Sequence, residues 1–362
     1  MAQPIQTRLK LLFTKAKKDV TESLLPDLLG FSYEDKETNE ADEISITLKD
    51  PAGKWAGTWK PEGGEVVRAY ITRGTIAEGE KTLFCGTFYV DTLHVSGAPR
   101  VFELKAVSIP LNKPIRRKIK SKAWEKHTLK KIAEAIAADA GVKLLFDAQE
   151  NPTYDRQDQQ RESDLKFLSR LCEDAGLSLK LTDDKLVIFD QSYYESKNPV
   201  KTITLNSSAI LSWDFESAQS ETYKSVTVSY RDPKQKKRGT AGGYKTSGTV
   251  EAKKDDNPAV MTYTYTDPTA DENGQEYELK KRAKSIEEAK RLAKAKLRQL
   301  NLRSVTGSLT LVGDTSLVAG EVIAIKGFGS FDGNFIIETA SHSIGNDGYT
   351  TGLSLRRVNN KY

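Results

Sequence analysis

Histidine and cysteine, two residue types that often carry catalysis, occur only three times and twice in this sequence. The three histidines, His94, His127 and His342, fall in different segments, and His94 and His342 hold nearly equivalent places in two similar strands. That placement favours a role in the strands over a shared metal site. HExxH, paired CxxC, GxSxG and phosphate-binding glycine motifs are absent, and Gly327-Phe328-Gly329 leads into a predicted hairpin, which is the wrong context for a dinucleotide. We therefore predict no catalytic, cofactor-binding or metal-binding residues.

Two carboxylate pairs, Glu162 with Asp164 and Glu173 with Asp174, are the remaining candidates for hydrolytic chemistry. Paired carboxylates can cleave glycosidic bonds, but both pairs lie on a predicted helix whose polar face carries such residues anyway. A set of aromatic residues could instead stack on sugars, although its alternation is typical of a sheet core. This set is Phe31, Tyr33, Trp213 and Phe215. We predict that the chain is not an enzyme; a peptidoglycan hydrolase and a carbohydrate-binding β module remain the alternatives.

The aromatic pairs belong to a segment that occurs twice. Residues 28–51 align without a gap with residues 210–233 at a constant offset of 182 (210 − 28). Because a one-residue slip turns every side chain of a strand to the other face, the conserved phase of the apolar positions matters more than the few identities. The matched positions are Phe31 with Trp213, Tyr33 with Phe215, and Ile44, Ile46 and Leu48 with Val226, Val228 and Tyr230.

Two further segments recur in the same order. Residues 64–67 (GEVV) are echoed by residues 320–323 (GEVI), and residues 86–97 by residues 333–344. The second copy then needs one long insertion after Pro233. We infer the duplication of a small antiparallel β domain, with chance likeness between β-hairpins as the alternative.

Composition restricts the class of protein. A chain of 362 residues with 38% hydrophobic and 29% charged residues predicts two or three globular domains. No apolar run approaches the length of a membrane span, and the N-terminus has no signal-peptide core. Cys85 and Cys172 lie in apolar patterns, so we expect buried thiols, with a disulfide as the alternative.

The charge balance does not predict nucleic-acid binding. The net charge is +5, with 55 basic residues interspersed among 50 acidic ones. The basic run Lys234 to Arg238 is typical of a solvated loop. A patch that binds an acidic partner is the alternative.

The predicted elements define three domains and a mainly β fold. Residues 1–110 contain strands without a long helix and predict a first antiparallel β-barrel-like domain. Residues 111–199 predict a small α+β domain, with helices from Thr128 to Gly141 and from Ser163 to Gly176, then a hairpin. Residues 200–362 predict a second, duplicated β-barrel-like domain that carries an insertion at 234–284, with a hairpin, and a helix at 285–302 opened by a capping box.

Several of these segments resemble a known family. Residues 31–51 (FSYEDKETNEADEISITLKDP) and 85–97 (CGTFYVDTLHVSG) resemble the opening domain of the late control D proteins of contractile-tailed phages. Residues 161–181 (RESDLKFLSRLCEDAGLSLKL) are similar to a helix-plus-hairpin segment that this family shares with the spike proteins of type VI secretion systems. Residues 320–344 also fit the family. The resemblance covers essentially the whole chain and is weakest over residues 234–284.

The resemblance implies a structural baseplate hub of a contractile phage tail or tail-like particle. In such a hub, a homotrimer with two similar β domains per chain presents six near-equivalent positions and joins the sixfold tail tube to the threefold central spike. The implied partners are the spike, the tube or tube-initiator protein and the baseplate wedge proteins, with the tape measure protein as a further candidate. The implied location is the baseplate of a virion or tail-like particle assembled in the bacterial cytoplasm. Because the chain ends just after its last predicted strand, we expect the spike and any hydrolase to be separate polypeptides.

Overall fold

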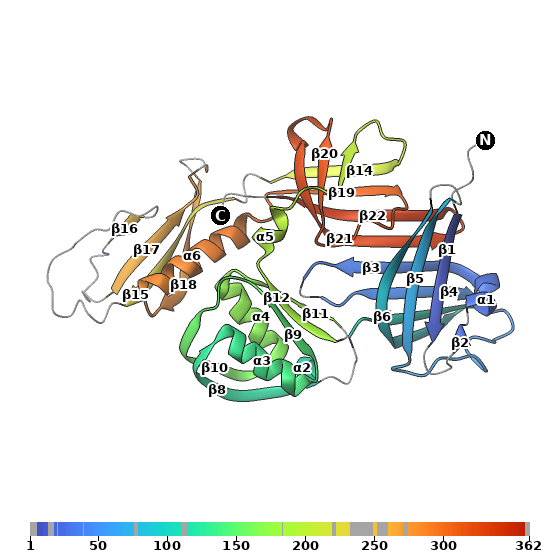
Figure 1. The fold of residues 1–362 in the computed structure, drawn as a ribbon, viewed down its shortest axis with the longest axis horizontal. Coiled ribbons are helices and arrows are strands. Elements are labelled where there is room, and N and C mark those ends of the chain that lie inside the picture. Colours follow the sequence, from blue (N-terminus) through green and yellow to red (C-terminus); the bar gives the residue numbers. More distant parts are fainter. Residues whose placement is uncertain are drawn as a thin grey trace.

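The computed structural model consists of one large sheet, a small α+β unit and a smaller sheet covered by a helix (Figure 1). It describes residues 6–13, 18–19, 21–38, 40–75, 79–109, 114–182, 184–218, 222–231, 249–251, 260–268, 270 and 274–358. The basic run Lys234 to Arg238 lies outside these ranges. Within them the buried apolar side chains form four clusters: one in each half of the large sheet, one in the α+β unit and one beneath the helix.

The first half of the large sheet is antiparallel and has the order β3-β4-β7-β6-β5-β1, with the short β2 (Lys18–Asp19) beyond β1. Alternate residues of each strand are buried, as the period of two predicts. A short helix α1 (Thr21–Leu24) and a 3₁₀ turn η1 (Leu25–Asp27) precede β3. The strands are β1 (Gln6–Phe13), β3 (Leu28–Lys36), β4 (Glu43–Lys49), β5 (Val66–Thr75), β6 (Gly79–Ser96) and β7 (Val101–Val107).

The second half of the large sheet has the order β14-β19-β22-β21-β20-β13. Its strands are β13 (Lys201–Thr204), β14 (Ile210–Ser217), β19 (Val305–Val312), β20 (Val322–Lys326), β21 (Gly333–Gly345) and β22 (Gly348–Arg357), with the 3₁₀ turn η4 (Gly329–Phe331) between β20 and β21. The two halves join where the far end of β21 pairs antiparallel with β3, from Thr339 opposite Lys36 to Gly345 opposite Gly30. Figure 1 shows β3, β21, β22, β19 and β14 following one another from this junction.

The two halves have the same strand order. In addition, β3 pairs with β4 in the same register as β14 pairs with β19. Phe31 lies opposite Ile46, and Trp213 lies opposite Leu309. The irregularity between Leu28 and Gly30 recurs between Ile210 and Ser212, again 182 positions on (212 − 30 = 182). The sequence alignment of β3 with β14 is therefore supported, including the position of the irregularity.

The hairpins β5·β6 and β20·β21 correspond equally closely. Val67 lies opposite Phe88, and Ile323 lies opposite Phe335. Gly64 donates its N–H to the carbonyl of Val90 at 2.8 Å, and Gly320 donates to the carbonyl of Ile337 at 2.8 Å. Both glycines have positive φ, 79° and 85°, a conformation that costs glycine little and other residues more.

One part of the sequence alignment is wrong. Ile44, Ile46 and Leu48 in β4 do not correspond to the strand β15 (Tyr223–Arg231), because β15 pairs with β17 and β18 in a separate sheet. The counterpart of β4 is β19, which pairs with β14 and β22 as β4 pairs with β3 and β7. Apolar alternation is common to all half-buried strands, so the pattern could not distinguish β15 from β19. The extra segment accordingly begins after Ser217 rather than after Pro233.

The barrel-like form expected for each half stays a prediction, because the strand pairing of the described ranges does not close either half into a ring. The large sheet is an open path that ends at β14 and β2, and β13 pairs with β20 in parallel although β1 pairs with β5 in antiparallel fashion. Strand edges therefore remain in the described part of the chain.

The α+β unit contains both predicted helices. Helix α3 (Leu129–Ala140) begins after Thr128, whose side chain accepts a hydrogen bond from the Lys131 N–H, and ends at Gly141 with φ of 65°. Helix α4 (Asp164–Ala175) is capped by Ser163 and ends at Gly176 in the same way. The predicted hairpin is β11 (Ser178–Leu181) with β12 (Lys185–Phe189), and β9 (Lys143–Asp147) adds to it in parallel.

Two strands of the unit are not among the predicted elements. These strands, β8 (Ile119–Thr128) and β10 (Thr153–Ser163), form an antiparallel ribbon. Few apolar residues alternate in this ribbon because most of its side chains are exposed, and only Trp124, Tyr154 and Gln159 are buried. Short helices α2 (Pro114–Arg117) and α5 (Gln191–Glu195) complete the unit.

The segment between β14 and β19 forms a sheet of its own with the order β16-β17-β15-β18. Its strands β16 (Thr249–Glu251), β17 (Val260–Thr266) and β18 (Gln275–Ala283) surround β15. The predicted hairpin corresponds to β16·β17, and the predicted helix is α6 (Ile286–Asn301), capped by Ser285, whose hydroxyl accepts from the Glu288 N–H at 3.2 Å. The helix buries Ala289, Leu292, Ala293 and Leu297, and Leu300 of the same face is partly buried. None of the helices in the described ranges has the length and apolar character that a membrane span requires.

Candidate assembly interface

The three histidines do not converge. His94 is exposed on β6 and His127 lies on β8, whereas His342 is buried in β21. The ring of His342 bonds to the Tyr349 hydroxyl at 2.7 Å and to the Leu317 carbonyl at 3.1 Å, and burial lowers its pKa. Within the described ranges, no group of three or more His, Cys, Asp or Glu side chains could hold a metal ion.

Three of the four carboxylates considered for hydrolysis, Glu162, Asp164 and Asp174, are held in ion pairs. Asp164 is buried and accepts from Lys120 at 2.5 Å and from Gln159 at 2.9 Å. Glu162 accepts from Arg170 at 2.8 Å, and Asp174 pairs with Lys281 of β18. Charge pairs of this kind tie α4 to β8, β10 and β18. Cys85 and Cys172 are both buried free thiols, as predicted, and lie in different apolar clusters.

The junction between the two sheet halves contains a small polar cluster. Lys180 of β11 donates to Asp35 at 3.2 Å and to the Lys36 carbonyl at 2.6 Å, and it lies 3.3 Å from Asp42. Burial disfavours the ammonium, but the carboxylates of Asp35 and Asp42 outweigh it and raise the pKa of Lys180. Asp35 also accepts from the Ala319 N–H at 2.9 Å. Lys180 thus connects the α+β unit to the first half of the large sheet, and Asp35 extends this connection to the second half through Ala319.

A second charged cluster surrounds Arg356 of β22, whose side chain is fully buried. Its guanidinium donates to Glu195 of α5 at 2.5 Å and lies 3.5 Å from Glu37 and 3.4 Å from Glu338. Arg298 of α6 also donates to Glu195, at 2.8 Å. Burial raises the pKa of Glu37 against the opposing effect of Arg356. Sequence reasoning missed this cluster because its members come from five elements that are far apart in the chain.

Exposed apolar side chains gather at strand edges. Leu211 and Trp213 on β14 are 55% and 52% exposed, and Val95 on β6 is 44% exposed. Beyond Val90, β6 pairs with β7 on one side, and β14 pairs only with β19; no other strand of the described ranges covers their outer edges. Uncovered edges with apolar residues are sites at which another chain adds strands.

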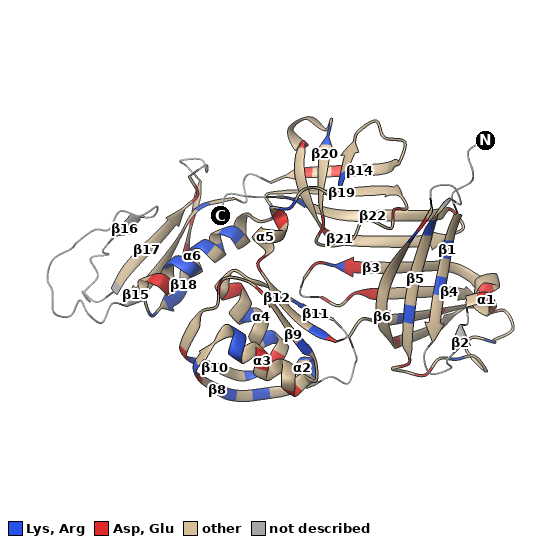
Figure 2. Ribbon diagram, viewed as in Figure 1, with Lys and Arg blue, Asp and Glu red and all other residues tan. Residues whose placement is uncertain are grey.

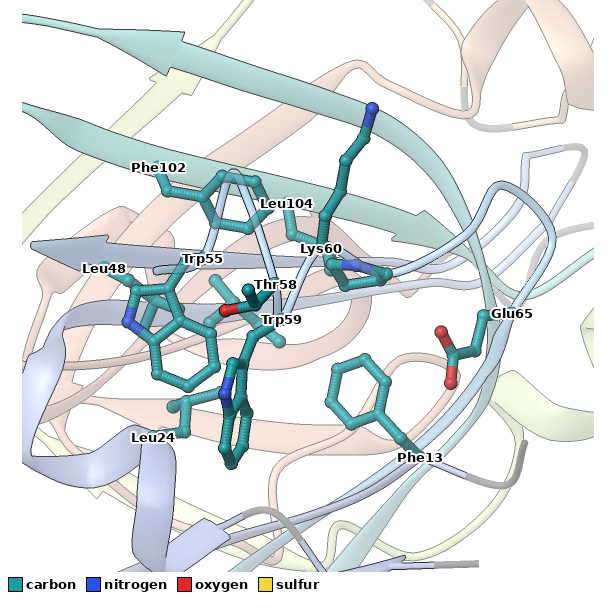
Figure 3. Close-up of a pocket in the computed structure, with 12 residues that line it drawn as sticks. Phe13, Leu24, Leu48, Trp55, Thr58, Trp59, Lys60, Glu65, Phe102 and Leu104 are labelled. Atoms are coloured by element: carbon teal, nitrogen blue, oxygen red, sulfur yellow. The ribbon is translucent and has the colours of Figure 1, made fainter. Parts of the chain in front are cut away.

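An apolar recess opens beside the first half of the large sheet. It has a volume of about 320 Å³ and includes Phe13, Leu24, Trp55, Trp59 and Phe102 in its lining. Figure 3 shows the two tryptophans of the loop after β4 facing this recess. The Trp55 indole N–H donates to Asp27 at 3.0 Å, and the Lys54 ammonium lies 4.3 and 4.6 Å from the two indole rings. Thr58, Lys60 and Glu65 are polar residues of the lining.

Basic residues are interspersed with acidic ones over the surface. Figure 2 shows basic residues along β8 and α6, with acidic residues on neighbouring elements.

Buried charges that connect the units and exposed strand edges are typical of a structural protein that works by assembly. The comparisons with known proteins are consistent with that class. A family model described as "Phage tail baseplate hub (GPD)" matches residues 78–348, about three quarters of the chain. The chain belongs to the phage tail baseplate hub family, so its place is the baseplate of a phage virion or tail-like particle.

Relatives of similar length carry the same description. The chain is 25% identical to a probable baseplate hub protein of Escherichia phage 186, over 95% of this chain and 92% of the relative. It is 29% identical to the probable baseplate hub protein of Escherichia phage P2, over 60% of this chain and 56% of that protein.

Solved structures share the fold. A tail protein from Neisseria meningitidis MC58 matches with a TM-score of 0.68 and 15% identity, over 98% of this chain and 99% of that one. The E. coli c3393 protein, a component of the type VI secretion system, matches with a TM-score of 0.54 and 15% identity, over 93% and 75% of the two chains.

Proposed function

We propose that this baseplate hub protein works as a trimeric adaptor, in which two related sheet halves per chain give six near-equivalent positions around a central axis. The ring would join a sixfold tail tube to a threefold central spike. A tandem repeat in a trimer resolves this mismatch because three chains then present six similar surfaces. The observation that carries the proposal is the common strand order and register of β3-β4-β7-β6-β5 and β14-β19-β22-β21-β20.

We infer that this correspondence reflects a duplication. Shared strand order alone recurs among unrelated sheets, but shared irregularities are more specific because a β-bulge is a designed feature of a family. The register shifts between Val90 and Thr92 on β6 and between Ile337 and Thr339 on β21 lie at matching places (337 − 90 = 339 − 92 = 247). On this reading residues 1–110 and 200–362 are the two related domains, and residues 111–199 form the α+β domain between them.

The segment between β14 and β19 has its own apolar cluster under α6. Ser217 lies opposite Val305 in the β14·β19 ladder, so the segment enters and leaves at neighbouring points. It is therefore an elaboration of the second domain that leaves that domain's sheet order unchanged.

The proposed partners are the central spike protein, the tail tube or tube-initiator protein, the wedge proteins of the baseplate and the tape measure protein. Assembly would take place in the cytoplasm of the bacterial host. We propose that the chain contributes no catalysis to the particle, since its candidate carboxylates are occupied by Lys120, Arg170 and Lys281. Incubation with purified peptidoglycan should release no soluble fragments.

The decisive experiment measures the mass of the complex by light scattering after the chain is co-expressed with the spike protein of the same particle. We expect three copies of this chain per three spike chains, and a cryo-EM map with a threefold axis and six similar sheet domains. A complex without a threefold axis would contradict the proposal. The chain alone serves as the comparison, because a hub trimer can require its spike to form.

A further inference from the structure

Within one chain, the two sheet halves meet at a single junction. The strand edges that correspond to this junction in the other half of each pair have no partner strand in the described ranges. Within the chain, the far end of β21 pairs with the outer edge of β3. The counterpart of β21 is β6, and the counterpart of β3 is β14. The outer edge of β6 beyond Val90 has no neighbouring strand in the described ranges, and neither has the outer edge of β14.

We propose that β6 of one chain pairs antiparallel with β14 of the next chain, which reproduces between copies the β21·β3 junction seen within one copy. This inference rests on the trimeric hub proposed above and specifies the contact that closes it. Three chains would then form a ring with six sheet-to-sheet junctions, three internal and three between chains. Each chain would contribute one edge of each kind, so the contact is head-to-tail and closes at three copies.

Exposure at the matching positions supports the pairing. Phe31 on β3 is 2% exposed, whereas its counterpart Trp213 on β14 is 52% exposed. His342 on β21 is fully buried, whereas its counterpart Val95 on β6 is 44% exposed. A residue is buried at the internal junction and its counterpart is exposed at the open edge, as expected when the open edge lacks its neighbouring strand.

The internal junction fixes the register between chains. His342 lies opposite Tyr33. A position in β6 is its counterpart in β21 minus 247, and a position in β14 is its counterpart in β3 plus 182. Val95 (342 − 247) therefore lies opposite Phe215 (33 + 182) in the proposed contact. The same arithmetic places His94 opposite Glu216 and Gly97 opposite Trp213. An imidazole then faces a carboxylate, and a residue without a side chain faces the largest aromatic ring.

Backbone hydrogen bonds agree with this register on the β14 side. Ala218 donates its N–H to the Ser304 carbonyl at 3.0 Å, so residues of the same parity, including Glu216, direct their backbone groups to β19. Trp213, Phe215 and Ser217 then direct theirs to the open edge, because the direction alternates along an antiparallel strand. In the internal junction the Glu37 N–H donates to the Glu338 carbonyl at 2.9 Å, so Tyr33, the counterpart of Phe215, likewise faces β21.

The test is a cysteine pair placed across the proposed contact in the full chain, co-expressed with its spike protein. His94 and Glu216 form a pair without mutual backbone hydrogen bonds, for which a Cα separation of about 4.5 Å suits a disulfide. The variant His94→Cys with Glu216→Cys should give disulfide-linked dimers and trimers on a non-reducing gel. The control is His94→Cys with Asp214→Cys, two residues out of register, where a Cα separation of about 7–8 Å is too long. The native thiols, Cys85 and Cys172, are buried in both proteins.

We expect at least tenfold more linked trimer from the in-register pair than from the control. A threefold complex with no preference between the two pairs would overturn this inference and leave the hub proposal standing. Failure of the unmodified chain to form a threefold complex would overturn both.

A second variant tests the edge without cysteines. Val95→Glu places a charge on the exposed edge and should abolish the threefold complex while the chain stays folded by circular dichroism. Ile119→Glu is the matched control, because Ile119 is 67% exposed on β8 of the α+β unit. A threefold complex that survives Val95→Glu unchanged would count against the proposed pairing.

Discussion

At the scale of single residues, the most consequential side chain is Arg356, because it is fully buried and its three carboxylate neighbours come from different elements. A buried ion cluster contributes little net stability compared with an apolar replacement of the whole cluster. Removal of one partner is different, since it leaves the opposite charges buried and unpaired. Arg356 therefore holds β22, α5, β21 and the end of β3 in one arrangement.

We expect Arg356→Met to lower the free energy of unfolding by about 3 kcal/mol or more, because Glu37 loses its buried countercharge and Glu195 keeps only Arg298. Urea unfolding monitored by circular dichroism measures the change. Arg303→Met is the control: Arg303 also pairs with Glu338 but is 72% exposed, so its loss should cost less than about 0.5 kcal/mol. Equal effects of the two variants would mean that the buried cluster is not a structural connection.

At the scale of elements, helix ends position the α+β unit against α6. Gly141 and Gly176 end α3 and α4 with φ of 65° and 72°, a left-handed conformation that disfavours other residues. Their surroundings differ. A Cβ at Gly141 would meet nothing within 4 Å, whereas one at Gly176 would lie 3.3 Å from the Ala295 Cβ of α6. The same cap is thus a simple helix stop in one case and a close helix contact in the other.

Gly176→Ala should therefore destabilise the protein more than Gly141→Ala. The backbone cost of about 1–2 kcal/mol is common to both substitutions. Only Gly176→Ala also pushes α6 away from α4. Thermal unfolding of the two variants side by side gives the difference, and a Gly141→Ala effect as large as that of Gly176→Ala would show that α6 is not in close contact at this point.

The element scale also shows where sequence patterns work. Both helices of the α+β unit and α6 have the predicted caps and apolar faces, because helix signals are local and lie within a few residues of each end. The ribbon β8·β10 was not predicted, because its strands are mostly exposed and lack apolar alternation. The match of β4 with β15 is wrong for the opposite reason, because several strands share the same alternation of apolar residues.

At the scale of the whole molecule, the segment between β14 and β19 is separable in principle from the large sheet. Ala218 and Ser304 are joined by a backbone hydrogen bond, so the two strands leave the sheet as neighbours. The segment also contacts the α+β unit through α6, where Arg298 pairs with Glu195. Its loss should affect stability more than assembly.

Replacement of residues 219–303 by Asn-Gly, a dipeptide suited to a two-residue hairpin, should leave a folded chain that still forms the threefold complex with the spike. Its melting temperature should fall, because α4 loses the cover of α6. Light scattering of the co-expressed complex and a thermal scan test both statements. A folded chain that no longer assembles would place an essential contact in the removed segment.

By itself the sequence determined the mainly β fold class, the capped helices and the buried cysteines, because each depends on local periodicity or on a residue at a helix end. Only the tertiary structure decided that β19 takes the place matching β4, that β3 and β21 pair, and that Lys180 and Arg356 connect separate units. Those facts depend on which distant strands meet. Strand pairing joins residues hundreds of positions apart through backbone groups that every residue carries, so side-chain patterns hold little record of it.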